Sequence, residues 1–83
     1  MKFTVVTLPS VDDALTQLWL EADDGQDVAD ASNWIERQLK NNPLNKVTRV
    51  DNVYFIRRDP LAALCKISID DRLVTIIEIH RVA

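Results

Sequence analysis

The chain has 83 residues, of which 47% are apolar and 28% charged, and its formal net charge is −3. One glycine and three prolines exclude a disordered or low-complexity chain, so we expect a single globular domain over residues 1–83. The apolar runs reach about five residues, against the roughly 20 that span a bilayer. With no secretory pattern and a single cysteine, the sequence predicts a cytoplasmic protein that makes no membrane contact.

The charges are divided unevenly along the chain. Residues 1–36 hold one cation against eight carboxylates, a formal charge of −7, whereas residues 37–83 hold nine cations against five carboxylates, or +4. The acidic total is unlike that of a general nucleic-acid-binding protein, but the basic half suits phosphate or an acidic partner. The alternative is that these charges are only the solvated surface of an ordinary helix pair and sheet.

The N-terminal half predicts a strand followed by two helices. Residues 2–8 (KFTVVTL) are rich in β-branched side chains, as strands are. Helical spacing follows over residues 10–22, with Ser10 as the expected N-cap. Gly25 is expected to break the pattern at a positive φ, and a second helix is expected from Gln26 to Asn41.

The C-terminal half predicts strands joined by short turns. The candidate strands are KVTRV, VYFIRR, LAALCKISI and RLVTIIEIHRV. In residues 61–69 the apolar side chains that alternate from Leu61 to Ile69 indicate a half-buried strand. Short connections favour antiparallel hairpins. The predicted fold class is α+β, in the order β-α-α-β-β-β(-β), with both N-terminal helices packed on one face of a small twisted antiparallel sheet.

The aromatic residues divide between core and surface. Trp19 falls in the apolar stripe of the first helix and is expected in the core, whereas Trp34 lies beside the second stripe and is expected to be partly exposed. Tyr54 and Phe55 are adjacent in one strand, so they face opposite sides of the sheet. One of them therefore points away from the helices and is a candidate for a partner surface.

Residues that carry familiar catalytic chemistry are few. One histidine and one cysteine exclude the usual zinc site, and no cofactor is expected. Cys65 lies on the apolar face of its strand, where a thiol packs as a small hydrophobe rather than acting as a nucleophile. Glu78 and His80 are two residues apart on one strand and share a face. They form either a carboxylate–imidazole pair or an ordinary exposed patch.

Cations cluster near the ends of the predicted strands. Arg57 and Arg58 close one strand, Lys66 lies within the next, and Arg81 ends the last. On neighbouring antiparallel strands these side chains would converge on one rim of the sheet, where they would suit phosphodiester chemistry. The alternative is that they are solvated, or that they guard a sheet edge.

The whole chain, through KFTVV, SVDDALTQLWLEA, IERQLKNNPL and PLAALCKISIDDRLVTIIEIHRV, resembles the RelE/ParE superfamily of bacterial type II toxins, which includes plasmid stabilisation toxins. The resemblance implies a toxin paired with a cognate antitoxin, and it implies the fold predicted above. RelE-type members cleave messenger RNA on the ribosome, and ParE-type members poison DNA gyrase. For an endonuclease that needs no metal, the site residues implied are His80, Arg81, Arg58 and Lys66.

The sequence also departs from the family pattern. Ala62 and Cys65 stand where family members carry an arginine and an aromatic residue, and the strand register does not decide between Arg57 and Arg58. The alternative function is therefore a catalytically inactive protein-interaction module on the same fold. In either case a copy of the chain is a further candidate partner, since an open sheet edge permits a homodimer.

Overall fold

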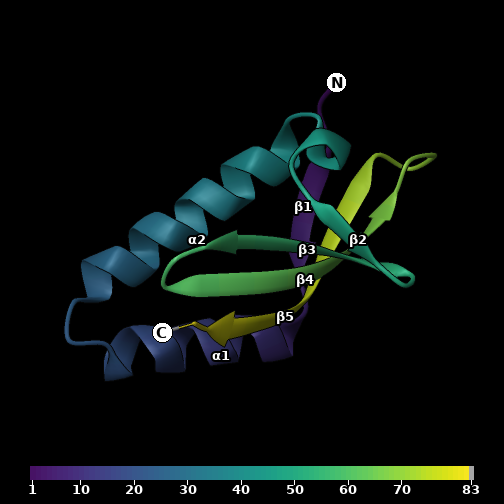
Figure 1. Cartoon of the computed structure of the whole chain (residues 1–83). Helices are drawn as coiled ribbons and strands as arrows, with labels where there is room; N and C mark the ends of the chain where they lie inside the picture. The colour runs from purple at the N-terminus through teal and green to yellow at the C-terminus, as the bar shows by residue number, and fades with distance from the viewer. Residues whose placement is uncertain (83) are drawn as a thin grey trace.

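The structure is a computed structural model that describes residues 1–82 (Figure 1). Within these residues the elements are β1 (Thr4–Thr7), α1 (Pro9–Glu21), α2 (Gly25–Lys40), a 3-10 turn (Pro43–Asn45), β2 (Thr48–Val50), β3 (Val53–Arg58), β4 (Leu61–Ser68) and β5 (Leu73–Arg81). The predicted order of elements is confirmed. The second helix lies within one residue of its predicted bounds.

The strands form one sheet in the order β1-β5-β4-β3-β2. Strands β2 to β5 are antiparallel neighbours, as their short connections predict. Strand β1 lies at the far edge and runs parallel to β5, from Thr4 opposite Leu73 to Thr7 opposite Ile76. The sheet is therefore mixed rather than wholly antiparallel. Hairpin spacing predicts only neighbours with short connections, whereas a parallel pair is joined by a long crossover.

Both helices pack on the same face of the sheet, and the core lies between the two layers (Figure 1). Helix α1 lies against β5, and α2 crosses β1, β3 and β4. Burial of apolar surface in this layer is the main stabilising contribution. The buried core residues are Phe3, Val11, Val28, Ala31, Ile35, Leu39, Ile56, Leu61, Ala63, Cys65, Val74, Ile76 and Ile79.

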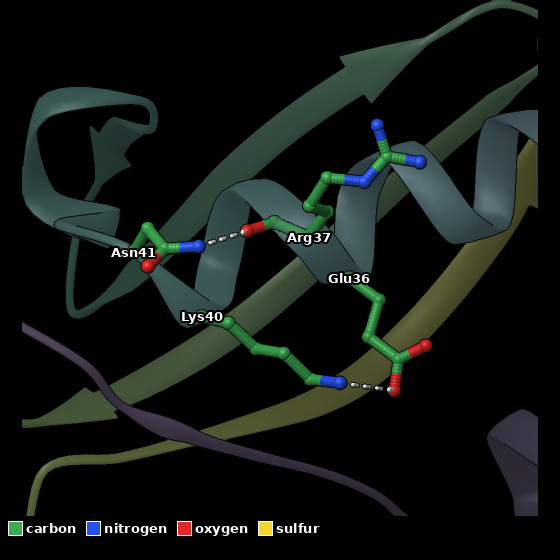
Figure 2. A network of polar contacts seen from close by, with 4 residues as sticks. All are labelled: Glu36, Arg37, Lys40 and Asn41. Carbon is green, nitrogen blue, oxygen red and sulfur yellow. Dashed lines mark hydrogen bonds and ion pairs between the residues drawn. The ribbon is translucent and has the colours of Figure 1, made fainter.

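The C-terminal end of α2 is held by local polar contacts (Figure 2). Lys40 Nζ lies 3.9 Å from Glu36 Oε1, one helical turn away, and Asn41 Nδ2 donates to the Arg37 carbonyl at 3.3 Å. Asn42 then adopts a left-handed conformation, with φ 49°, and Pro43 begins the 3-10 turn. The helix therefore ends at Lys40, before the asparagine pair and one residue short of its predicted end at Asn41.

Two predicted helix signals are wrong. The first helix begins two residues earlier than predicted, with Pro9 rather than Val11 as its first residue, and Ser10 lies inside it instead of capping it. Proline suits that position because its missing N–H has no partner in the first turn. Gly25 has no positive φ; it is the first residue of α2, where the Asp24 side chain accepts from the Gln26 amide at 2.9 Å.

The expectation for Trp19 is also wrong, whereas those for the other aromatic residues are confirmed. Trp19 is 50% exposed, because the sheet-facing side of α1 is defined by Val11 and Leu18 and the indole lies beside it. Trp34 is half-buried. Tyr54 packs against the core, so its neighbour Phe55 faces away from the helices.

The β4–β5 turn is longer than the predicted strands implied. Strand β4 ends at Ser68, so Ile69 lies in the turn, where it is 56% exposed. The residues from Ile69 to Arg72 make this turn, and Arg72 has a φ of 50°. Among residues 1–82, no helix combines the length and the apolar character needed to cross a membrane.

Leu39 and Leu44 provide a matched test of the core. Leu39 on α2 is 0% exposed and Leu44 in the 3-10 turn is 44% exposed. Leu39→Ala is expected to lower the free energy of unfolding by about 2–5 kcal/mol, because it removes buried methyl groups and leaves a cavity. Leu44→Ala is expected to change it by no more than about 0.5 kcal/mol. Urea denaturation followed by circular dichroism measures both; equal losses would contradict this core.

Candidate functional site

The candidate site lies on the open face, the side of the sheet that α1 and α2 do not cover within residues 1–82. Arg57 on β3 is opposite Ala62 on β4, and Ala62 is opposite His80 on β5, so these side chains form one row across the sheet. The next row on the same face consists of Phe55, Leu64 and Glu78. Between these rows lie core residues that face the helices, namely Ile56, Ala63 and Ile79.

A β-bulge in β5 sets the direction of the last strand residues. Val74, Ile76 and Ile79 are all buried, but the spacing between them is two residues and then three. The register with β4 shifts between Ile76 and Glu78, which leaves one extra residue in β5. Unbroken alternation from Val74 would turn Glu78 and His80 toward the core. The bulge turns both of them to the open face instead.

Glu78 and His80 form a pair on the open face. The imidazole Nε2 lies 3.8 Å from Glu78 Oε1, and both side chains are more than half exposed. The prediction that they share a face is confirmed. At this distance the pair is an exposed electrostatic contact rather than a hydrogen bond, and the imidazole is open to solvent, where it could transfer a proton.

Arg57 supplies a cation at the other end of the same row. Its Nε donates to Asp59 Oδ1 at 2.6 Å, and both groups are exposed. This hydrogen bond, reinforced by the charge, lowers the pKa of the Asp59 carboxyl below its ordinary value and raises the pKa of Arg57 above its own. The small Ala62 separates Arg57 from His80, so their backbones are about two strand spacings, or roughly 10 Å, apart.

Lys66 is on the open face but lies away from His80. It pairs with Thr75 and follows Ala62 by four residues, which is roughly 13 Å along β4. Phe55 and Leu64, both half-buried, lie between Lys66 and the Arg57–His80 row. On the open face the apolar side chains of Phe55 and Leu64 therefore separate Lys66 from Arg57.

Arg58 and Arg81 point to the helix-covered side. Both are paired with Leu61, which is fully buried, so they share its face at the ends of β3 and β5. The Arg58 guanidinium lies over the Trp34 ring, 5.1 Å from its centroid, a cation–π contact. The structure thus places Arg58 and Arg81 on one face and His80 and Lys66 on the other, and does not gather all four.

The register selects Arg57, which the sequence left open against Arg58, as the arginine in line with His80. Adjacent strand residues face opposite sides of the sheet. The alternation alone therefore does not tell which of the two arginines faces His80; the pairing of β3 with β4 must be known as well. Cys65 is fully buried, as predicted, and burial raises its thiol pKa to about 11. A thiol in this state is not a nucleophile at neutral pH.

The layout is an α+β fold with two helices on one side of a small mixed sheet and the row of Arg57, Ala62 and His80 on the other. No protein-family model and no curated protein matches the chain. Among solved structures, it is similar to a chain in the crystal structure of the toxin–antitoxin complex RelBE2 from Mycobacterium tuberculosis. The identity is 18% and the TM-score 0.78, over 98% of this chain and 92% of that one. At this identity the likeness establishes the fold.

Burial of Cys65 predicts how its thiol reacts. In the folded protein at pH 8, a soluble thiol reagent should label Cys65 at least about 100-fold more slowly than in concentrated urea, because burial removes both access and thiolate. Absorbance of the released reagent measures both rates. Rapid labelling without denaturant would contradict a core position.

The same burial predicts a loss of stability in alkali. The folded-state pKa of Cys65 is above the ordinary value of 9.0, so its contribution is complete below about pH 9 and is lost as the pH rises through about 11. Cys65→Ala should remove this part of the pH dependence, measured by urea denaturation at each pH.

Proposed function

We propose that the chain is the toxin of a bacterial type II toxin–antitoxin system and inhibits growth by cleaving messenger RNA on the ribosome. The observation that carries this proposal is the fold, shared over 98% of the chain with a chain of a toxin–antitoxin complex. The site proposed is the open-face row of Arg57, Ala62 and His80, together with Glu78. The proposed setting is the bacterial cytoplasm.

The proposed chemistry uses the RNA's own 2′-hydroxyl. His80, with the Glu78 carboxylate 3.8 Å from its Nε2, takes the proton from this hydroxyl, and the hydroxyl oxygen forms a bond to the adjacent phosphorus. The bond from phosphorus to the 5′-oxygen breaks, and the imidazolium returns the proton to that oxygen. Arg57 stabilises the extra negative charge on the phosphate oxygens in the transition state.

The remaining open-face residues suit a single strand of RNA. Phe55 presents an aromatic ring on which a base can stack, and Lys66 lies beyond it to hold a more distant phosphate. Arg81 adds positive charge at the end of β5, beside His80, and Arg58 adds it at the end of β3. We assign these two arginines to contacts with the RNA backbone at the rim of the sheet, because their side chains leave the sheet on the helix-covered face.

A cognate antitoxin is the proposed protein partner, because the similar solved chain belongs to a toxin–antitoxin complex. A second candidate function is an inactive interaction module. Ala62 favours it, since this methyl group occupies the centre of the proposed site between Arg57 and His80 and offers neither charge nor proton.

Growth after induction tests the proposed toxin activity. Expression of the chain alone in a bacterial host should arrest growth, and primer extension should detect cleaved messenger RNA that depends on ribosomes. His80→Ala and Arg57→Ala should each lower the cleavage rate by about 10²–10⁴-fold, because they remove proton transfer and charge stabilisation. Lys2→Ala should leave it unchanged, since Lys2 precedes β1 near the start of β5, away from His80.

The outcomes separate the alternatives. Arrest with intact messenger RNA, accompanied by cleaved DNA bound to gyrase, would replace the ribosome with gyrase as the target. If the unchanged chain is expressed as soluble protein and growth is unimpaired, the result would favour the interaction module and contradict a toxin.

A further inference from the structure

Helix α1 leaves much of its apolar surface without a partner. Among its residues Val11 alone is buried, while Trp19 is 50% exposed and Leu20 is 63% exposed. These adjacent large side chains lie near the end of the helix, away from the sheet. An exposed tryptophan beside an exposed leucine is the kind of surface that binds another protein.

A hollow of about 310 Å³ lies between α1 and α2, next to this surface. Leu15 and Trp19 line it from α1, and Val28, Ala29 and Ser32 line it from α2. A second hollow also touches Leu15 and Ser32 and continues to the carboxylates of Asp12 and Glu36. Together these form the helical groove, which is apolar at the Trp19 end and acidic at the other.

Gly25 keeps the Trp19 indole in place. A Cβ atom at residue 25 would lie 2.7 Å from the indole Nε1, closer than real Cβ atoms approach other atoms. The absence of a Cβ therefore allows the close approach of Trp19, and a larger residue at this position would displace the indole. In the structure the indole lies along the groove, with half of its surface open to a partner.

The groove lies on the acidic layer of the molecule. Residues 3–36 contain eight carboxylates and no lysine, arginine or histidine. Of these carboxylates, Glu36 alone has an ion-pair partner in the part of the chain that the structure describes, and that contact with Lys40 is 3.9 Å long. Two of the carboxylates, Asp12 and Glu36, line the groove; Asp12 also accepts from the Thr7 hydroxyl at 2.6 Å, and no lysine or arginine is among the described residues that line it. The negative charge at the groove attracts a cationic partner and repels nucleic acid and anionic membrane surfaces.

We propose that the helical groove binds a basic amphipathic helix of another protein, whose apolar side chains cover Trp19 and whose lysines or arginines face the carboxylates. A helix fits because a groove between two helices takes apolar anchors at helical spacing. A second copy fits less well, because this chain's cations lie mainly on strands and turns. Such a contact would also be heterologous, and would give a ring or an open chain of molecules rather than a simple two-fold dimer. The inference stands without the proposed toxin activity.

The test uses the whole chain and a synthetic peptide. The peptide has about 16 residues, or roughly four helical turns, with leucines at one helical face and lysines elsewhere. In the Trp34→Phe variant, Trp19 is the sole tryptophan, so its fluorescence reports on the groove. The peptide is expected to shift this emission to shorter wavelength, with an affinity that weakens as salt is added. A glutamate version of the peptide and a scrambled lysine version are expected not to do so.

Matched variants locate the binding. In calorimetry, Trp19→Ser is expected to weaken peptide binding at least about tenfold. Ile69→Ser, which changes a similarly exposed apolar residue in the β4–β5 turn, is expected to leave it unchanged. Asp12→Asn combined with Glu36→Gln should weaken it while leaving the apolar surface intact, and circular dichroism checks the fold of each variant.

Several results would overturn the inference. Equal binding of the scrambled peptide would mean that charge alone attracts it, and full binding by Trp19→Ser would place the peptide elsewhere. A shift of Trp19 emission on raising the protein concentration, without peptide, would assign the groove to a second copy. Because growth arrest is not a readout, failure of this inference is separate from failure of the proposed toxin activity.

Discussion

Strand β5 is the element on which the rest of the structure depends, because it joins the two ends of the chain. It pairs in parallel with β1 on one side and antiparallel with β4 on the other. It also contributes Val74, Ile76 and Ile79 to the core beneath the helices. A domain of this size has a small core, so the loss of one central strand would remove a large share of its stability. The N-terminal strand and the C-terminal hairpins are held together through β5.

The bulge in β5 connects this role in folding to the candidate site. It allows Ile79 to stay buried after Ile76 while Glu78 and His80 turn to the open face. Without the bulge, Ile79 would face solvent and His80 would enter the apolar layer, where an unpaired polar group is costly. The energy that buries the isoleucines therefore also fixes the direction of the imidazole. The geometry of the candidate site does not need a separate supporting network.

The sequence predicted most of the fold, because β-branched runs, helical spacing and short turns are local signals. It failed where tertiary contacts replaced local preferences: Gly25 serves the Trp19 indole rather than a left-handed turn. For the site, residue spacing predicted that Glu78 and His80 share a face, but only the bulge decides which face. The choice of Arg57 over Arg58 likewise needed the register with β4, which alternation within one strand cannot supply.

The net charge of −3 is divided unevenly between the helices and the sheet. The helices carry most of the carboxylates, whereas the open face carries Arg57, Lys66 and His80 with Glu78. Because Asp59 pairs with Arg57 and Glu78 lies beside His80, the open face carries charges of both signs, with Lys66 as a separate cation. The helical groove and the open face lie on different layers, so a cationic helix and an anionic strand would not compete for the same residues.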